Sequence, residues 1–486
     1  MTQMSSILRG GRLTATRSDV VNFISSLSAD RRIMVSTVLV NEAHVVALER
    51  CRAIQRPAAT KILRALRQLE KRKLPNRSAE DIHVVIEEYV TKRTGREIGG
   101  LMHLGKSRND QVATAIRMTL RNEIHEFAQT MLAFELSLIE LAQKYTDSVF
   151  PGYTHLQPAQ PISFGHYLLA NCFAFLRDSD RLAEAYVRIN RSPMGAAALA
   201  GTSFPLDRGL IVRLLGFDGV VEASLDAVEG RDFALEALGG LALIATDLSR
   251  LASDLIFYAT AEVGLIAIPD EFASTSSIMP QKKNPDPLEL VRAKSAKVAA
   301  NFGSALTVMH GLTSGYNLDY QEITPLLWQS LDELASCLRI LLAIMPGITL
   351  DESIARRSQL EFTAATEIAN ILVREEHVPF RIAHQKVGSV VKTTTRQRKA
   401  LREMRQSDWQ KALGFPLKRS TCRLIAYSLD LNHHIHCYRT AGSPNPRETT
   451  RLIAQASNKW RELNRTNRRA STKIQVSMRL LRRMAT

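Results

Sequence analysis

The chain has 486 residues, of which 45% are hydrophobic and 23% are charged, so it is long enough for two or three globular domains. Charges interrupt its apolar stretches, the N-terminus has no run of signal-peptide length, and five cysteines form no CxxC pair. A membrane span and a disulfide framework are therefore not expected, and we predict a cytoplasmic protein. The net charge of +16 is concentrated at the end, where residues 447–486 carry +9, so nucleic-acid binding is not expected of the main body.

The first zone, residues 1–105, combines short helical patterns with loops. One helix in this zone has clear end signals. We expect Ser78 to be its N-cap, with Asp81 three residues later, and Gly95 to end it. This zone is predicted to form a mostly helical N-terminal domain.

The second zone, residues 106–350, consists of long amphipathic helices. Its two longest apolar stripes advance by three or four residues at each step. Stripes of this length need partner helices along their whole length, so we predict an all-α fold with a central bundle of about five long helices. The first stripe contains Ile116, Leu120, Ile124, Phe127, Met131, Phe134, Leu138 and Leu141, and the second contains Leu238, Leu241, Ile244, Leu248, Leu251, Leu255 and Tyr258.

The rest of the chain divides into two further zones. Residues 351–460 carry shorter helical patterns, with a break at Val378-Pro379, and are predicted to form a small C-terminal helical domain. Residues 461–486 form a basic tail. Its apolar residues make no long stripe, so we expect it to be solvated or in contact with another subunit.

Three polar segments lie at the ends of the predicted long helices. The first, "SRNDQ", places Ser107, Arg108, Asn109 and Asp110 directly before a long helix. Simple N-capping accounts for one polar residue at such a place. An anion site accounts for the group, because Arg108 would join the backbone N–H groups and the positive end of the helix dipole. Spacing alone leaves both interpretations open.

The second polar segment, "GYTHLQPAQP", is a loop punctuated by glycine and proline. It contains Thr154 and His155. A lone histidine in a loop is more often a hydrogen-bonded structural residue than a catalyst, so the local sequence does not assign it a function.

The third polar segment, "SSIMPQKKNPD", covers residues 276–286 and precedes another helix. A predicted capping box from Asp286 to Glu289 accounts for Glu289. Lys282 and Asn284 have no such explanation, and they offer a second place for negative charge near a helix N-terminus. Ser276 begins the segment, and a serine hydroxyl becomes a base only where surrounding charge stabilises its alkoxide.

These segments together resemble the argininosuccinate lyase family of the fumarase/aspartase superfamily. Further matches are "EDIH", "ALAGTSFPLDR", "SGYNLDYQE" and "PFRIAHQKVG", and all occur in the order of the family. The resemblance implies an almost all-α protomer of three domains, and a homotetramer with a core of about 20 long helices. It also implies active sites that are each shared between subunits.

The resemblance assigns a role to each matching residue. Ser276 matches the base that removes a proton beside a carboxylate, and Lys282 and Asn284 match groups that stabilise the resulting anion. His155 matches a histidine linked to protonation of the departing nitrogen, and Glu289 matches its carboxylate partner. Motif positions do not reveal which of Ser276 and His155 is base and which is acid. The substrate-holding positions are Ser26, Ser107, Asn109, Thr154, Tyr316 and Gln321, with Arg108 as an added anion contact; neither a cofactor nor a metal is implied.

Three residues depart from the family pattern. Thr275 replaces a glycine before the two serines, so the loop should be stiffer. Thr324 stands where many members have a substrate-contacting lysine, and it is also a plausible N-cap before Pro325. Ala197 replaces a glycine in "GAAALAGT".

The implied activity is the β-elimination of argininosuccinate to L-arginine and fumarate, the last step of arginine biosynthesis. The nearest alternative is another fumarate-releasing lyase of the superfamily, such as adenylosuccinate lyase. A second alternative is a catalytically silent structural homologue. A nucleic-acid binder is a third, and it depends on the basic tail alone.

Overall fold

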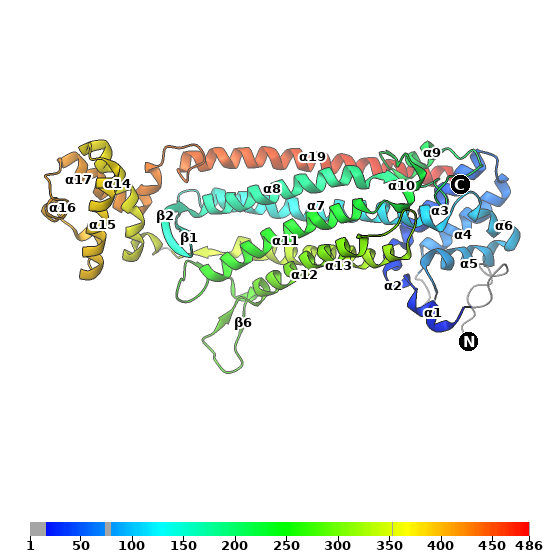
Figure 1. The fold of residues 1–486 in the computed structure, drawn as a ribbon, viewed down its shortest axis with the longest axis horizontal. Helices are drawn as coiled ribbons and strands as arrows, with labels where there is room; N and C mark the ends of the chain where they lie inside the picture. The colour runs from blue at the N-terminus through cyan, green and yellow to red at the C-terminus, as the bar shows by residue number, and fades with distance from the viewer. Residues whose placement is uncertain (1–15, 73–78, 352, 486) are drawn as a thin grey trace.

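The computed structural model describes residues 16–72, 79–351 and 353–485. Figure 1 shows an elongated molecule, with a central bundle of long helices and a group of shorter helices at each end. The predicted all-α fold class is confirmed. The strands in the described residues form four short two-stranded pieces.

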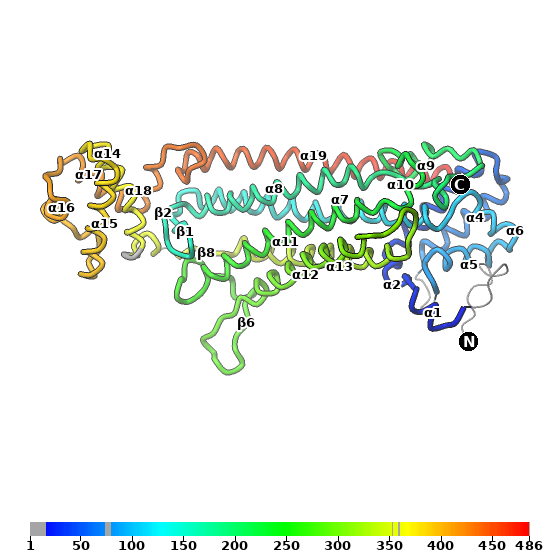
Figure 2. The backbone as a smooth tube through the Cα atoms, in the orientation of Figure 1, coloured from blue at the N-terminus to red at the C-terminus, as the bar shows by residue number. Residues whose placement is uncertain are grey.

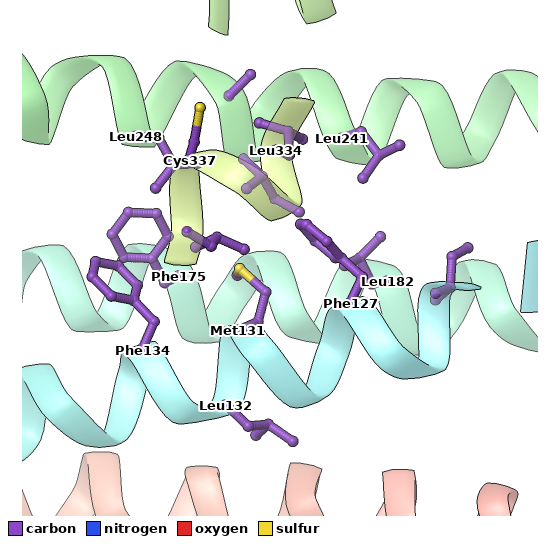
Figure 3. Close-up of a cluster of buried hydrophobic side chains, with 14 of the residues drawn as sticks. Phe127, Met131, Leu132, Phe134, Phe175, Leu182, Leu241, Leu248, Leu334 and Cys337 are labelled. Carbon is purple, nitrogen blue, oxygen red and sulfur yellow. The ribbon is translucent and has the colours of Figure 1, made fainter. Parts of the chain in front are cut away.

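The central bundle contains the five long helices that the sequence predicts. Every residue of both predicted stripes is buried. Figure 3 shows how side chains from four of these helices interlock in the core. Both long stripes are thus covered within one chain. The five helices are α7 (Arg108–Lys144), α8 (Phe164–Ile189), α11 (Asp232–Tyr258), α12 (Asp286–Met309) and α13 (Ile323–Ile344).

A sixth long helix, α19 (Pro446–Met484), lies along the bundle beside α7 and α8 (Figure 2). The boundary expected at residue 461 falls inside this helix, so the basic tail is its second half. The tail was expected to be solvated or in contact with another subunit. Its inner face instead packs within the same chain, where Leu481 is fully buried, and contact of its outer face with another subunit stays a prediction. The Trp460 indole N–H also donates to the Leu132 carbonyl of α7 over 2.8 Å. The inner positions include Ala456 and Ser477, which are too small or too polar to produce an apolar stripe in the sequence.

The N-terminal end of the bundle is covered by short helices. The helix with clear end signals is α5, and its N-cap is Asp81, which accepts a hydrogen bond from the Val84 N–H over 2.7 Å. Its predicted end at Gly95 is confirmed, and Ser78 lies outside the described residues. The helices at this end are α1 (Ser18–Phe23), α2 (Leu27–Asp30), α3 (Met34–Arg50), α4 (Arg56–Glu70), α5 (Ile82–Thr94), α6 (Arg96–Gly100), α9 (Arg208–Leu215) and α10 (Ser224–Glu229).

A small group of helices covers the opposite end of the bundle (Figure 1). The predicted break at Val378-Pro379 is confirmed: His377 ends α14 in the left-handed conformation, and Pro379 is the N-cap of α15. The helices of this group are α14 (Ala365–Glu376), α15 (Phe380–Gln397), α16 (Gln406–Leu413), α17 (Arg419–Leu429) and α18 (Leu431–His434).

Two hairpins carry the remaining polar segments of the sequence. The first is formed by β1 (Val149–Thr154) and β2 (Gln157–Ser163), and the second by β6 (Ser274–Thr275) and β7 (Lys283–Asn284). The other pairs are β3 (Arg191–Ser192) with β4 (Gly219–Val220) and β5 (Ile266–Ala267) with β8 (Thr349–Leu350). Across the described ranges, every helix is too short or too polar to cross a membrane.

Candidate active site

A cavity of about 410 Å³ lies at the N-terminal end of the bundle, where α2, the start of α5, the start of α7 and the start of α13 meet. Six of the residues predicted to hold substrate line it together. The chain thus brings into one place residues that are up to 295 positions apart in the sequence. These six are Ser26, Ser107, Arg108, Asn109, Tyr316 and Gln321.

The N-terminus of α7 forms one wall of the cavity. Ser107 is the N-cap: its hydroxyl oxygen accepts a hydrogen bond from the Asn109 N–H, and its own N–H donates to Asp110 over 3.0 Å. The capping interpretation of "SRNDQ" is therefore confirmed for Ser107 and Asp110. Arg108 and Asn109 also line the cavity, at the positive end of a helix of 37 residues, but Arg108 pairs with Asp81 and Glu80, and the Asn109 amide donates to the Ala198 carbonyl. An anion site at this helix end stays a prediction.

Three acidic residues line the cavity: Asp30, Glu80 and Asp81. Asp30 and Asp81 have contrasting environments. Asp30 is buried and accepts a hydrogen bond from the Ser26 hydroxyl over 2.6 Å. Burial raises the pKa of Asp30 to about 6. Burial would also raise the pKa of Asp81, but His83 and the Arg108 guanidinium, 2.7 Å away, lower it overall. The cavity therefore presents one carboxylate held in an ion pair, and one buried carboxyl group whose pKa is raised above its ordinary value.

Arg231 supplies a further cation to the cavity wall. It is 3% exposed, and its Nη1 donates to the carbonyls of Val228 and Gly230, each over 3.0 Å. Its Nε has no hydrogen-bond partner among the described residues. The guanidinium lies 4.7 Å from the centre of the Tyr320 ring, and Tyr316 packs edge-on against Tyr320. Burial lowers the pKa of Arg231.

Sequence reasoning did not name four of the charged wall residues as site residues: Asp30, Glu80, Asp81 and Arg231. Glu80 and Asp81 belong to the "EDIH" match, whereas Asp30 and Arg231 lie outside the quoted motifs. Thr324 also lines the cavity, buried in the first turn of α13, and the prediction that it is an N-cap is wrong because Glu322 holds that position. Its side chain is therefore part of the site wall.

Thr154 ends β1 and His155 begins the turn of the β1–β2 hairpin, well away from this cavity. The hairpin is at the other end of α7 (Figure 1), and a helix of 37 residues is about 55 Å long. His155 and Leu156 form the tip in left-handed conformations, with φ of 53° and 57°. Such values are uncommon for residues other than glycine, so the turn holds the exposed imidazole in a strained but defined position.

Ser276, Lys282 and Asn284 lie in the β6–β7 hairpin, which projects from the bundle into solvent (Figure 1). The Ser276 hydroxyl oxygen accepts hydrogen bonds from the N–H groups of Ile278 and Met279, over 3.3 and 3.2 Å. Lys283 is held by Asp270 over 2.6 Å, while Lys282 is exposed. This hairpin is also outside the cavity of its own chain.

The predicted capping box at the start of α12 is wrong. Pro285 is the N-cap and makes no side-chain cap, and Asp286 instead accepts a hydrogen bond from the Ser274 hydroxyl. Asp286 therefore ties the hairpin to the helix. Glu289, freed from capping, is exposed on the first turn of α12. Thr275 pairs with Lys283 in the hairpin.

Ala197 adopts a left-handed conformation with φ of 51°, where the related proteins were expected to have glycine. Its N–H and the N–H of Gly195 donate to the buried carboxylate of Asp110, over 2.9 and 3.0 Å. Burial raises the pKa of Asp110 to about 6, against the lowering effect of these N–H groups. The "GAAALAGT" loop is thereby anchored to the wall of the cavity.

Comparison with known proteins places this geometry in a family. Residues 20–300 match a family described as lyase, and residues 362–427 match the argininosuccinate lyase C-terminal family. Argininosuccinate lyase of Methanocaldococcus jannaschii is 39% identical over 453 residues, covering 92% of this chain and 93% of that protein. The enzyme of Methanosarcina barkeri is 38% identical over 470 residues, covering 95% and 94%.

Solved structures show the same fold. A crystal structure of EDDS lyase in complex with formate has a TM-score of 0.87 at 27% identity, covering 93% of this chain and 91% of that chain. The class II fumarase from Schistosoma mansoni has a TM-score of 0.69 at 17% identity, covering 81% and 89%. The second likeness concerns the fold alone.

Proposed function

The chain belongs to the argininosuccinate lyase family, and from this we propose that it cleaves argininosuccinate into L-arginine and fumarate by β-elimination, as a carbon–nitrogen lyase. The observation that carries the proposal is the cavity, which gathers six of the expected substrate-holding residues at the N-terminus of α7. We place the reaction in arginine biosynthesis in the cytoplasm.

The charges of the cavity support this substrate. Argininosuccinate carries three carboxylates together with a guanidino group and an amino group. The N-terminus of α7 and Arg231 suit carboxylates, and Asp30 suits a cationic group. Arg108 would bind a carboxylate while it also holds Asp81 and Glu80. A substrate that carries both positive and negative groups needs a cavity lined by both acidic and basic side chains. Binding of the substrate displaces water from this cavity.

We assign the chemical step to the β6–β7 hairpin and the β1–β2 hairpin. In our proposal Ser276 removes the proton beside a carboxylate, which creates a doubly charged intermediate. The two backbone N–H groups that point at the Ser276 oxygen favour its alkoxide form. Lys282 and Asn284 stabilise the intermediate, and such fixed donors lower a barrier of this kind by about 3 kcal/mol each. His155, paired with Glu289, protonates the departing nitrogen.

These assignments require more than one subunit, because one chain keeps the hairpins apart from its own cavity. We therefore propose a homotetramer in which each site combines the cavity of one chain with hairpins of others. The outer face of α12 supports close helix contact, because small residues occupy it and are exposed. These residues are Ala293, Ala296, Ala299, Ala300 and Gly303.

The test is to incubate the purified protein with argininosuccinate and to follow the absorbance of fumarate. Adenylosuccinate, at the same concentration, is the control substrate for the nearest alternative function. We expect fumarate from argininosuccinate and none from adenylosuccinate. Absence of fumarate from both, with a folded protein, would support a catalytically silent homologue.

A further inference from the structure

The outer face of α19 carries a row of arginines. Arg461, Arg465 and Arg468 follow one another at intervals of four and three residues, and Arg479 comes 18 residues after Arg461, which is five helical turns. Arg469 flanks the row. All five side chains are exposed, whereas Leu463 and Leu481 on the other side of the helix are buried. We call these five residues the arginine row, and it covers about 27 Å of the helix.

The charge of the arginine row is not neutralised within the chain. In residues 16–72, 79–351 and 353–485, none of the five guanidinium groups has a carboxylate within ion-pair distance. Other cations of α19 differ: Lys459 pairs with Asp180 over 2.8 Å, and Lys473 pairs with Asp218. The cations at the sides of α19 are therefore paired with carboxylates, whereas the arginines on its outer face are not. The sequence, in which this segment is only a basic tail, does not distinguish the two groups.

A groove of about 930 Å³ runs beside the row, between α8 and α19. Arg177 of α8 lines it together with Arg461, Arg465 and Arg468. Its acidic residues are Asp180 and Glu462, and Lys459 is close to both, over 2.8 and 3.5 Å. Arg177 thus brings the number of guanidinium groups that line the groove to four, and the groove surface is net positive.

The shape and composition of this surface favour one class of anionic partner over the others. A lipid surface needs an apolar helix face to insert, and the apolar face of α19 is buried in the bundle. Single strands are usually held by stacking on several exposed aromatic side chains, but the groove has only the half-buried Phe173 among its described lining residues, and the Trp460 indole is engaged with Leu132. Guanidinium groups in a line match rows of phosphates. In B-form DNA these phosphates flank a major groove that is wide enough for the outer face of a helix, whereas the A-form major groove is too narrow.

We propose that the arginine row of α19, with Arg177, binds double-stranded DNA through its phosphate backbone, without sequence preference. This proposal is independent of the lyase activity. Binding of this kind has a Kd of about 10⁻⁴ to 10⁻⁶ M at physiological salt, and it weakens steeply as salt is added. In Figure 1, α19 runs along the side of the bundle opposite to the β6–β7 hairpin.

The experiment measures fluorescence anisotropy of a labelled mixed-sequence DNA duplex with the full-length protein at several salt concentrations. The triple arginine variant carries Arg461→Gln, Arg465→Gln and Arg468→Gln together. The matched control is Arg381→Gln, Lys392→Gln and Arg396→Gln, which removes the same charge from exposed positions of α15. Fumarate release and gel filtration check that both variants keep the native fold.

We expect the triple arginine variant to bind DNA at least about 10-fold more weakly than wild type. The slope of its plot of log K against log salt concentration should be less negative by about 3. The control should bind within about 2-fold of wild type. Equal weakening of DNA binding in both variants would show that net charge, not the arginine row, governs binding, and would overturn the proposal. The proposal would also be overturned if wild type did not bind the DNA duplex at low salt. The same holds if wild type bound single strands, RNA duplexes or anionic vesicles more tightly than the DNA duplex.

Discussion

The guanidinium of Arg482 lies 3.3 Å from the carboxylate of Glu42, and this contact joins the last turns of α19 to the middle of α3. Glu42 is fully buried, and burial raises its pKa to about 7, while the charge of Arg482 lowers it. Arg482 also pairs with Glu70 of α4, and its carbonyl accepts a hydrogen bond from Arg67. The far end of the chain thus secures the N-terminal helices that support the cavity.

Replacement of Arg482 should destabilise the protein in a pH-dependent manner. In Arg482→Met, Glu42 loses its nearer cation and keeps only Arg67, 4.0 Å away, so its buried charge becomes less well compensated and its protonation is favoured. The pKa of Glu42 in the folded protein is raised above its ordinary value, so Glu42 is ionised in wild type only above about pH 7. The variant should therefore lose stability mainly above about pH 7, and the loss should become smaller toward pH 5. Because Arg482 is partly exposed, we expect the free energy of unfolding to fall by about 1–2 kcal/mol at pH 8.

Thermal or urea unfolding of Arg482→Met at pH 5 and pH 8 measures this effect. The control is Arg479→Met, which removes an exposed arginine from the same helix. A loss that is the same at both pH values would contradict the assignment to Glu42.

A second stability prediction concerns Glu135, which lies in the middle of α7. Its side chain is fully buried, its Oε1 accepts a hydrogen bond from the Ser179 hydroxyl over 2.5 Å, and its Oε2 has no partner in the described part of the chain. Burial raises its pKa to about 8. In the unfolded chain the Glu135 carboxyl group loses its proton near pH 4.5, whereas in the folded protein it keeps the proton up to about pH 8. The free energy of unfolding therefore decreases as the pH rises from 4.5 to about 8.

Glu135→Gln removes this loss, because glutamine does not titrate. We expect the variant to gain on the order of 1–2 kcal/mol relative to wild type between pH 5 and pH 8, with no further gain above. Exposed Glu126, replaced by Gln, serves as the control. Parallel stability curves for Glu135→Gln and wild type would show that Glu135 is ionised in the folded state throughout this range.

The left-handed conformation of Ala197 predicts that glycine stabilises this position. Ala197→Gly relieves a conformation that is unfavourable for alanine by about 1–2 kcal/mol. The greater freedom of glycine in the unfolded chain offsets part of this, so the expected gain is about 0.5 kcal/mol. Ala198→Gly, at a neighbouring position without positive φ, should instead be destabilising. Chemical denaturation of both variants decides the matter, and a loss in both would contradict the strain argument.

Replacement of Ser276 tests the proposed base. Ser276→Ala should lower kcat by several orders of magnitude and leave KM within a few-fold, because a hydroxyl adds little to ground-state binding. Lys283→Gln in the same hairpin is the structural control, since Lys283 is engaged with Asp270. Near-normal turnover by Ser276→Ala would transfer the base role to another group, with His155 first in line.

Sequence patterns predicted the bundle well where large apolar residues recur, as from Ile116 to Leu141. They failed for α19, because its inner face uses Ala456 and Ser477, and small residues leave no apolar signal. They also failed at Asp286, where a contact with Ser274 from another strand displaced the expected cap. Local spacing does not encode a partner of that kind.

The candidate site was predictable in part. Motif residues such as Ser107 and Gln321 were named from the sequence, and the structure brings them into one cavity. Asp30 and Arg231 could not be found in this way, because each becomes significant only when the fold buries it at the cavity wall. The separation of Ser276 from that cavity is likewise a property of the three-dimensional arrangement (Figure 1).

The most direct test of the account is complementation between two inactive variants. Asn109→Leu alters the cavity, and Ser276→Ala alters the hairpin, so each homotetramer should be inactive. The two proteins are unfolded together in equal amounts, refolded, and assayed for fumarate release from argininosuccinate. If each site takes Asn109 from one chain and Ser276 from another, roughly a quarter of the sites in mixed tetramers regain both residues, and activity returns to that level. Mixed tetramers that are correctly assembled but remain inactive would contradict shared sites built from this cavity and this hairpin.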